Sequence, residues 1–105
     1  MIKHITYDGK QYPIRISYYV LEMVASELNL KLDDVTTNIS AQKDVLWYAL
    51  IAGHHMAKKE LTLKREDCVW ILDECYLEYQ RALFEFGKSI VDMQEDLMKG
   101  EDKKK

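Results

Sequence analysis

The chain has 105 residues, of which 48% are hydrophobic and 31% are charged, a composition typical of one globular domain rather than of a disordered segment. Its formal net charge is −3 and no basic block lies on a predicted element, so the sequence does not indicate a nucleic-acid-binding protein. No apolar run approaches the roughly 18 residues that a membrane-spanning helix needs.

A β-hairpin is predicted at the start of the chain. Asp8-Gly9 favours a two-residue type I′ turn, which needs a positive φ at both positions. Pro13 marks the second strand as partly an edge, because proline donates no hydrogen bond to a strand ladder. A lone hairpin is marginal in water, so its apolar face must lie on helices or on another subunit. Tyr12 and Ile14 on that face are therefore candidate contact residues.

Two helices are predicted next, over about residues 18–28 and 40–59. Ser17 is the expected N-cap of the first helix, and Asn29 suits its end. A short helix capped by Asp33 is expected between the two. The second long helix carries small residues that would let another helix approach closely, namely Ala49, Ala52, Gly53 and Ala57.

A third helix is predicted from about Lys64, with Thr62 as its N-cap. Its apolar residues follow a heptad a/d pattern over four repeats, and the position after each a is also apolar, which widens the apolar face. On the polar side, Glu78 and Arg81 form an expected i,i+3 ion pair. The a positions are Val69, Tyr76, Leu83, Ile90 and Leu97, the d positions are Leu72, Tyr79, Phe86 and Met93, and the additional column is Trp70, Leu77, Phe84 and Val91.

This broad apolar face has two explanations. It either forms the intramolecular core, or leaves a part uncovered that contacts a second copy or a helical partner. On the second explanation, the candidate contact residues are Trp70, Leu77, Phe84 and Val91 on the helix, with Tyr12 and Ile14 on the hairpin. Gly87 leaves open whether the third helix is continuous.

The predicted fold class is mainly α with a short N-terminal β-hairpin (α+β by strict count), built of about three to four helices. We expect a single domain over residues 1–98, with the hairpin at about residues 3–16. Residues 99–105 are expected to form a disordered charged tail, because nothing in this segment can pack against the domain.

The sequence indicates no catalytic, cofactor-binding or metal site. The adjacent His54 and His55 point about 100° apart on a helix, so they cannot chelate one ion together. Cys68 and Cys75 lie about 10 Å apart on a helix, beyond the reach of a disulfide. The chain has no Gly-rich phosphate loop and no G-x-S-x-G motif. We therefore expect a protein that is not an enzyme and uses no cofactor.

Three short segments follow one another in a distinctive order: Gly9-Lys10-Gln11-Tyr12-Pro13 in the second strand, Trp47 to His54 in a helix, and Leu61-Thr62-Leu63 before the next helix. Over about residues 3–90, this order resembles the tail assembly chaperones of long-tailed bacteriophages. In that family a Gly-Lys-x-Tyr-Pro-like strand, a Trp-Ala-Gly-His-like helix and a Leu-Thr-type cap recur in the same order.

The resemblance implies a non-catalytic function. Such chaperones coat the helical tape measure protein and keep it soluble until tail tube subunits polymerise around it and displace them. The implied partners are the tape measure protein and further copies of the chain in a homo-oligomer, without nucleic acid or membrane. The implied location is the host cytoplasm, with no copy in the mature virion. Lys103-Lys104-Lys105 are compatible with the ribosomal slippage site of many such genes, although a solubilising tail is the simpler explanation.

Two other functions fit the small size, the acidity and the lack of catalytic motifs. The first is a small phage-encoded regulatory or inhibitory protein that binds another macromolecule. The second is a minor structural component of the virion, such as a head–tail connector piece. A metal-dependent or hydrolytic enzyme ranks last.

Overall fold

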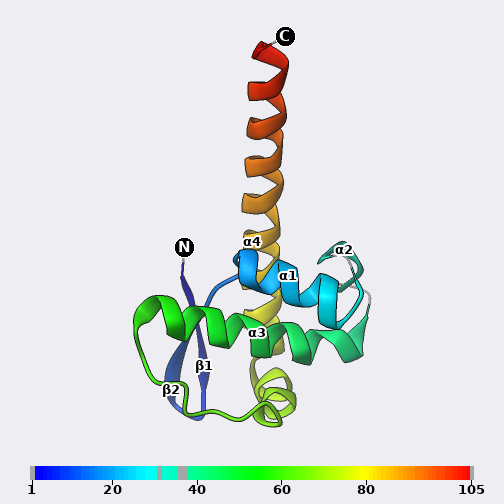
Figure 1. The fold of residues 1–105 in the computed structure, drawn as a ribbon. Coiled ribbons are helices and arrows are strands. Elements are labelled where there is room, and N and C mark those ends of the chain that lie inside the picture. Colours follow the sequence, from blue (N-terminus) through cyan, green and yellow to red (C-terminus); the bar gives the residue numbers. More distant parts are fainter. Residues whose placement is uncertain (1, 31, 36–37, 105) are drawn as a thin grey trace.

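A computed structural model describes residues 2–30, 32–35 and 38–104, with side chains described for residues 2–30, 34–35 and 38–85. It confirms a mainly helical fold that opens with a two-stranded antiparallel hairpin (Figure 1). The elements in chain order are β1 (Lys3–Tyr7), β2 (Lys10–Ile14), α1 (Tyr18–Glu27), α2 (Leu32–Val35), α3 (Ile39–Ala57) and α4 (Asp67–Lys104).

The hairpin turns where the sequence predicts. Asp8 and Gly9 have φ values of 51° and 75°, as a type I′ turn requires. The two strands pair in register from Tyr7 opposite Lys10 to Lys3 opposite Ile14. Because the turn fixes this register, it also decides which hairpin side chains face the helices.

Helix α3 is the centre of the core. It contacts β2, α1, α2 and α4, and Figure 1 shows it crossing both the hairpin and α4. Ten of its residues are buried, including Val45, Leu46 and Leu50. The core cluster around it draws one or more side chains from every other element, including Ile5, Ile14, Val20, Val24, Val35, Ile71 and Tyr79.

The small residues of α3 receive a strand rather than the helix that the sequence predicts. A Cβ added at Gly53 would lie 2.4 Å from the carbonyl oxygen of Pro13, a distance that real Cβ atoms do not show. One residue beyond β2, the Arg15 N–H donates to the carbonyl oxygen of Ala49 at 3.1 Å. Strand β2 therefore meets α3 at backbone contact, and only glycine fits at position 53.

Two predicted helix ends are correct, and two predicted helix starts are shifted. Ser17 precedes α1, and Asn29 ends it with a φ of 55° while the Leu30 N–H donates to the carbonyl oxygen of Val24. Helix α4 begins at Asp67 rather than at Lys64, and the turn before it is closed by the Lys64 N–H, which donates to the Asp67 carboxylate at 2.7 Å.

Helix α3 is capped by the residue two positions before the predicted start. The Asn38 side chain accepts the Ala41 N–H at 3.1 Å, so the helix begins at Ile39 rather than at Ser40. This shift places Ile39 in the first helical turn.

Helix α4 bends at Cys75 and is continuous at Gly87. Cys75 has non-helical angles (φ −126°, ψ 38°), and its thiol donates to the carbonyl oxygen of Ile71 at 3.0 Å. A side chain that enters the i−4 hydrogen-bond ladder is a known cause of helix bending. The first turns of α4 thus run in a different direction from the long segment that extends beyond the other elements in Figure 1.

The backbone of α4 continues as helix to Lys104, where the sequence analysis expects a disordered tail from residue 99. Extending an existing helix avoids the cost of nucleation, and the lysines and glutamate of this segment are good helix formers. The tail therefore prolongs α4 in the structure.

Strand β1 lies against α4 through polar contacts. The N–H groups of Asp8 and Thr6 donate to the carboxylates of Glu74 and Glu78, at 3.0 and 3.4 Å. Lys3 forms an ion pair with Glu85. Glu78 thus accepts a backbone N–H from the hairpin, and the expected Glu78–Arg81 ion pair is not formed.

Candidate functional site

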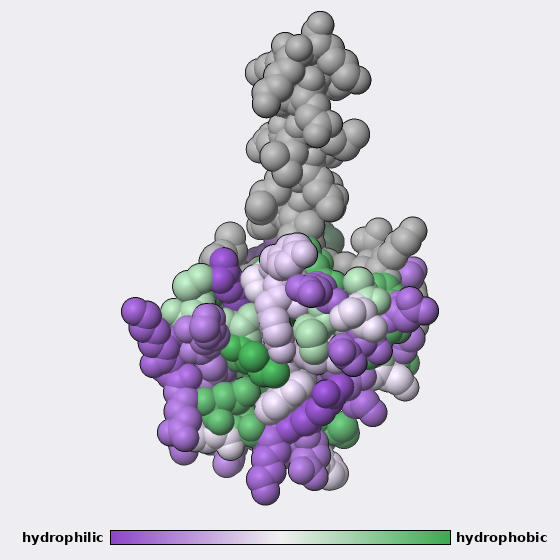
Figure 2. All heavy atoms as spheres, in the orientation of Figure 1, coloured by the Kyte–Doolittle hydropathy of each residue, from purple (hydrophilic) through white to green (hydrophobic). Residues whose placement is uncertain are grey.

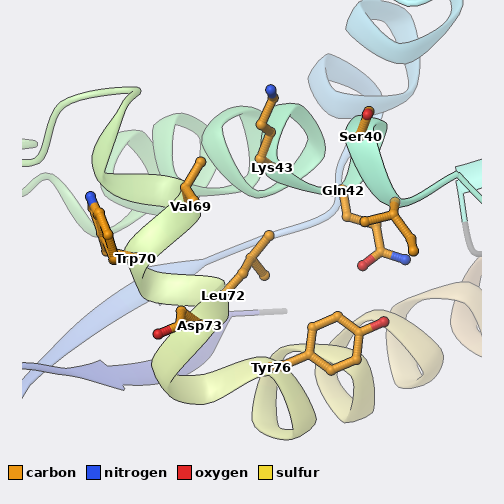
Figure 3. A pocket seen from close by; sticks show the side chains of 9 residues that line it. Ser40, Gln42, Lys43, Val69, Trp70, Leu72, Asp73 and Tyr76 are labelled. Atoms are coloured by element: carbon orange, nitrogen blue, oxygen red, sulfur yellow. The ribbon is translucent and has the colours of Figure 1, made fainter.

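Exposed apolar side chains gather at one place on the described surface. Of the nine large hydrophobic residues that are exposed in the described part of the chain, four line a single open groove of about 400 Å³ between the start of α3 and the start of α4. We call it the α3–α4 groove (Figure 3). It is lined by Ile39, Ser40, Gln42, Lys43, Val69, Trp70, Leu72, Asp73 and Tyr76. Clustered exposed apolar surface usually marks an interaction site.

The N-cap of α3 at Asn38 and the bend of α4 at Cys75 position this groove. The Asn38 cap places Ile39 in the first turn of α3, where its side chain is 81% exposed. On the other wall, Figure 3 shows Leu72 reaching toward α3 between Val69 and Tyr76. The bend at Cys75 separates the turn that carries Val69 from the segment that continues beyond Tyr76.

A buried hydrogen-bond network lies beneath the groove. Gln42 is buried, and its side-chain oxygen accepts the Gln80 amide at 3.0 Å. The Gln42 carbonyl oxygen accepts the Tyr79 hydroxyl at 3.4 Å. Burial raises the pKa of the Tyr79 hydroxyl, so this group stays protonated and able to donate. The network holds α3 and α4 in a fixed relation and supports the groove from below.

Charges of both signs lie beside the groove, in an adjoining hollow that shares Lys43 and Val69 with it and is also lined by Asp44, Arg65 and Glu66. Arg65 forms an ion pair with Asp44 at 2.8 Å, lies over the ring of Tyr48, and has its pKa raised by the Asp44 hydrogen bond. Lys43 and Asp73 form no ion pair with another described residue. The groove therefore offers an apolar floor with charges available at its edge.

A second hollow adjoins the groove along α4. It is lined by three carboxylate residues with Leu77, and shares Asp73 and Tyr76 with the groove. We call it the acidic hollow, lined by Thr6, Asp73, Glu74, Cys75, Tyr76, Leu77 and Glu78. An apolar and an acidic depression thus lie side by side.

The histidines and cysteines that the sequence offers as candidate reactive groups have structural roles or lie on the surface. His54 is buried, with Nδ1 2.7 Å from the carbonyl oxygen of Leu50, whereas His55 is exposed. Burial raises the pKa of the Cys68 thiol to about 12 and that of Cys75 to about 11, and neighbouring carboxylates contribute to both shifts. Within the described part of the chain, no three His, Cys, Asp or Glu residues are grouped to hold a metal ion.

The predicted contact residues divide into four groups. Trp70, Leu77 and Phe84 are 64%, 71% and 75% exposed, although the bend at Cys75 places Trp70 on a different segment from the other two. Ile14 is 1% exposed and belongs to the core, because backbone contact with α3 buries the end of β2.

The remaining two predicted contact residues are Tyr12 and Val91. Tyr12 is partly buried, with its ring centroid 6.3 Å from that of His54. The side chain of Val91 lies outside the described residues. The structure therefore removes Ile14 from the candidate surface.

Sequence reasoning missed Ile39 and the groove that it lines. Ile39 lies in a segment with no regular periodicity, and its role depends on the approach of two helices that are distant in the sequence. An exposed isoleucine directly after an N-cap asparagine was the available signal. Figure 2 shows apolar patches on the face crossed by α3, interrupted by hydrophilic side chains.

Comparison of the chain with protein-family models, with curated proteins and with solved structures found no match. Among the described residues, no helix combines the length and the apolar character needed to cross a bilayer. The site is thus interpreted from its own geometry, as an apolar groove and an adjoining acidic hollow.

Proposed function

We propose that the protein is a tail assembly chaperone of a long-tailed bacteriophage, which binds the tape measure protein and keeps it soluble. The observation that carries this proposal is the α3–α4 groove, continued along α4 by the exposed side chains of Leu77 and Phe84. The order of the hairpin, the Trp47-to-His54 helix and the Leu61-Thr62-Leu63 segment supports the choice of family.

The mechanism needs no catalysis. A client helix places its apolar stripe against Trp70, Leu77 and the groove, which removes that stripe from water. The contact has to be of modest strength, because polymerising tail tube subunits must displace the chaperone. An open groove with charged edges meets this requirement better than a deep enclosed pocket.

The proposal places the protein in the host cytoplasm during assembly. Once the tail tube covers the tape measure protein, the chaperone has no remaining binding site there, so we expect it to be absent from the mature virion.

Co-expression with the tape measure protein of the same phage tests the proposal. We expect the tape measure protein to become soluble and to co-purify with the chain. Trp70→Ala together with Leu77→Ala should abolish this effect. The matched control is Tyr18→Ala, which removes an aromatic side chain of similar exposure from α1 and should leave solubility unchanged.

Two results would contradict the proposal. The first is a tape measure protein that is equally insoluble alone and with the chain. The second is detection of the chain in purified particles by mass spectrometry, which would favour a structural virion component instead.

A further inference from the structure

The described part of α4 is strongly acidic around its apolar side chains. Between Asp67 and Glu85 the helix carries five carboxylates and a single cationic residue, Arg81. The whole chain has a net charge of only −3, so negative charge is concentrated on this segment.

Four of these five carboxylates form no ion pair with a cationic side chain of the described residues. Glu74 and Glu78 accept neutral backbone N–H groups of the hairpin, and Asp73 forms no ion pair with a described residue. Of the five, Glu85 pairs with a cation, Lys3. The acidic hollow therefore presents three uncompensated carboxylates beside the apolar groove.

The two depressions together match one type of ligand. The groove can receive a large apolar side chain, and the acidic hollow can receive an ammonium or guanidinium group next to it. On an α-helix, residues three or four apart lie on the same side, so one helix can present both groups at once.

A second copy of the chain fits this surface poorly. Pairing the described face of α4 with itself would bring carboxylates of one copy against those of the other, and like charges in contact disfavour association. A partner with positive charge along the edge of its apolar stripe gains instead from charge complementarity.

We infer that the segment bound here is a basic amphipathic α-helix, with an apolar side chain in the α3–α4 groove and a lysine or arginine in the acidic hollow. This inference rests on the proposed function in taking a helical client as the occupant, and it adds the chemistry of that client.

Two synthetic peptides test the inference with the intact chain. Both carry the same leucine stripe over roughly 18 residues, one with lysine and one with glutamate on the polar positions. We expect the lysine peptide to bind at least about tenfold more tightly, and to bind more weakly as the salt concentration rises from about 0.05 M to about 0.5 M. Tryptophan fluorescence and calorimetry report the binding.

Two charge-reversal variants locate the effect. Asp73→Lys lies in both depressions and should weaken binding of the lysine peptide about tenfold. Glu22→Lys makes the same change on the exposed face of α1 and should leave binding unchanged. Circular dichroism verifies that both variants are folded, and Trp70→Ala should weaken binding of the lysine peptide independently of charge.

Three outcomes would overturn the inference. They are equal binding of both peptides, binding of neither, or a concentration-dependent dimer that Trp70→Ala dissociates. The proposed function can fail independently of this inference. If the chain binds the lysine peptide at Asp73 but does not solubilise the tape measure protein, the binding site is supported and the tape measure protein is not its client.

Discussion

Two neighbours hold the hairpin in physically different ways. Strand β2 meets α3 at backbone contact, where Gly53 leaves room for Pro13 and the Arg15 N–H donates to the carbonyl oxygen of Ala49. Strand β1 meets α4 through exposed side-chain contacts to Glu74, Glu78 and Glu85. We call these the β2–α3 seam and the β1–α4 seam.

The difference shows which part of the molecule fixes the fold and which part is available for binding. Backbone contact tolerates no change in side-chain volume, so the β2–α3 seam determines the position of the hairpin. Exposed hydrogen bonds and ion pairs contribute little free energy each, so the β1–α4 seam fixes α4 weakly through its polar edge. The outer face of α4 is then left to carry the groove and the acidic hollow.

The largest expected effect is at Gly53. Gly53→Ala should lower the free energy of unfolding by at least about 3 kcal/mol, because the new Cβ would overlap the Pro13 carbonyl and strand β2 would have to move. Helix propensity alone predicts the opposite sign, a gain of about 1 kcal/mol. Urea unfolding measures the difference.

Gly9→Ala is the control for that substitution. No atom lies within 4 Å of a Cβ added at Gly9, so its cost should be limited to about 1 to 2 kcal/mol for a positive φ. If Gly53→Ala is as stable as the unmodified chain, strand β2 does not meet α3 at backbone contact.

The next effect concerns the two buried thiols of α4, Cys68 and Cys75. The pKa of Cys68 rises from 9.0 to about 12 and that of Cys75 from 9.0 to about 11, so the folded chain keeps both protons after the unfolded chain has released them. The stability that depends on the two protonated thiols should therefore be fully present well below pH 9 and be lost as the pH rises from about 9 to about 11, with the larger loss at Cys68.

Chemical denaturation as a function of pH measures this loss. The double variant Cys68→Ala, Cys75→Ala should show a flatter decline between pH 9 and pH 11 than the unmodified chain. An identical slope in both proteins would mean that the two thiols are hydrated rather than buried.

Substitution in the polar part of the β1–α4 seam should have a smaller effect. Glu74→Ala removes the acceptor of the Asp8 N–H but leaves that group accessible to water, so the cost should stay below about 1 kcal/mol. Amide hydrogen exchange at Asp8 should accelerate locally. Glu66→Ala, at an exposed carboxylate outside the seam, is the matched control, and a loss as large as that of Gly53→Ala would show that the two seams are alike.

The smallest effect is expected on the outer face of α4. Phe84→Ala should change the free energy of unfolding by no more than about 0.5 kcal/mol, because the ring is already 75% exposed. The neighbouring Leu83→Ala should cost about 2 kcal/mol or more, since Leu83 is buried. Comparable losses at the two positions would mean that Phe84 is part of the core rather than of a binding surface.

The sequence by itself determined the features that depend on local interactions. The Asp8-Gly9 turn, the N-cap at Ser17 and the left-handed residue at Asn29 follow from backbone preferences of single residues. The mainly helical fold follows from periodicity, whereas the width of the apolar face left open whether Trp70, Leu77 and Phe84 belong to the core or to an uncovered surface.

Only the tertiary structure decided the features that join distant segments. Ile14 was buried and Gly53 made essential by the approach of a strand to a helix some forty residues later in the chain, which no local pattern records. The bend at Cys75 and the cap at Asn38 bring Ile39 and Trp70 to one groove. The physical reason is that periodicity tells which face of an element is apolar, whereas the shape of the contact depends on backbone distances between elements.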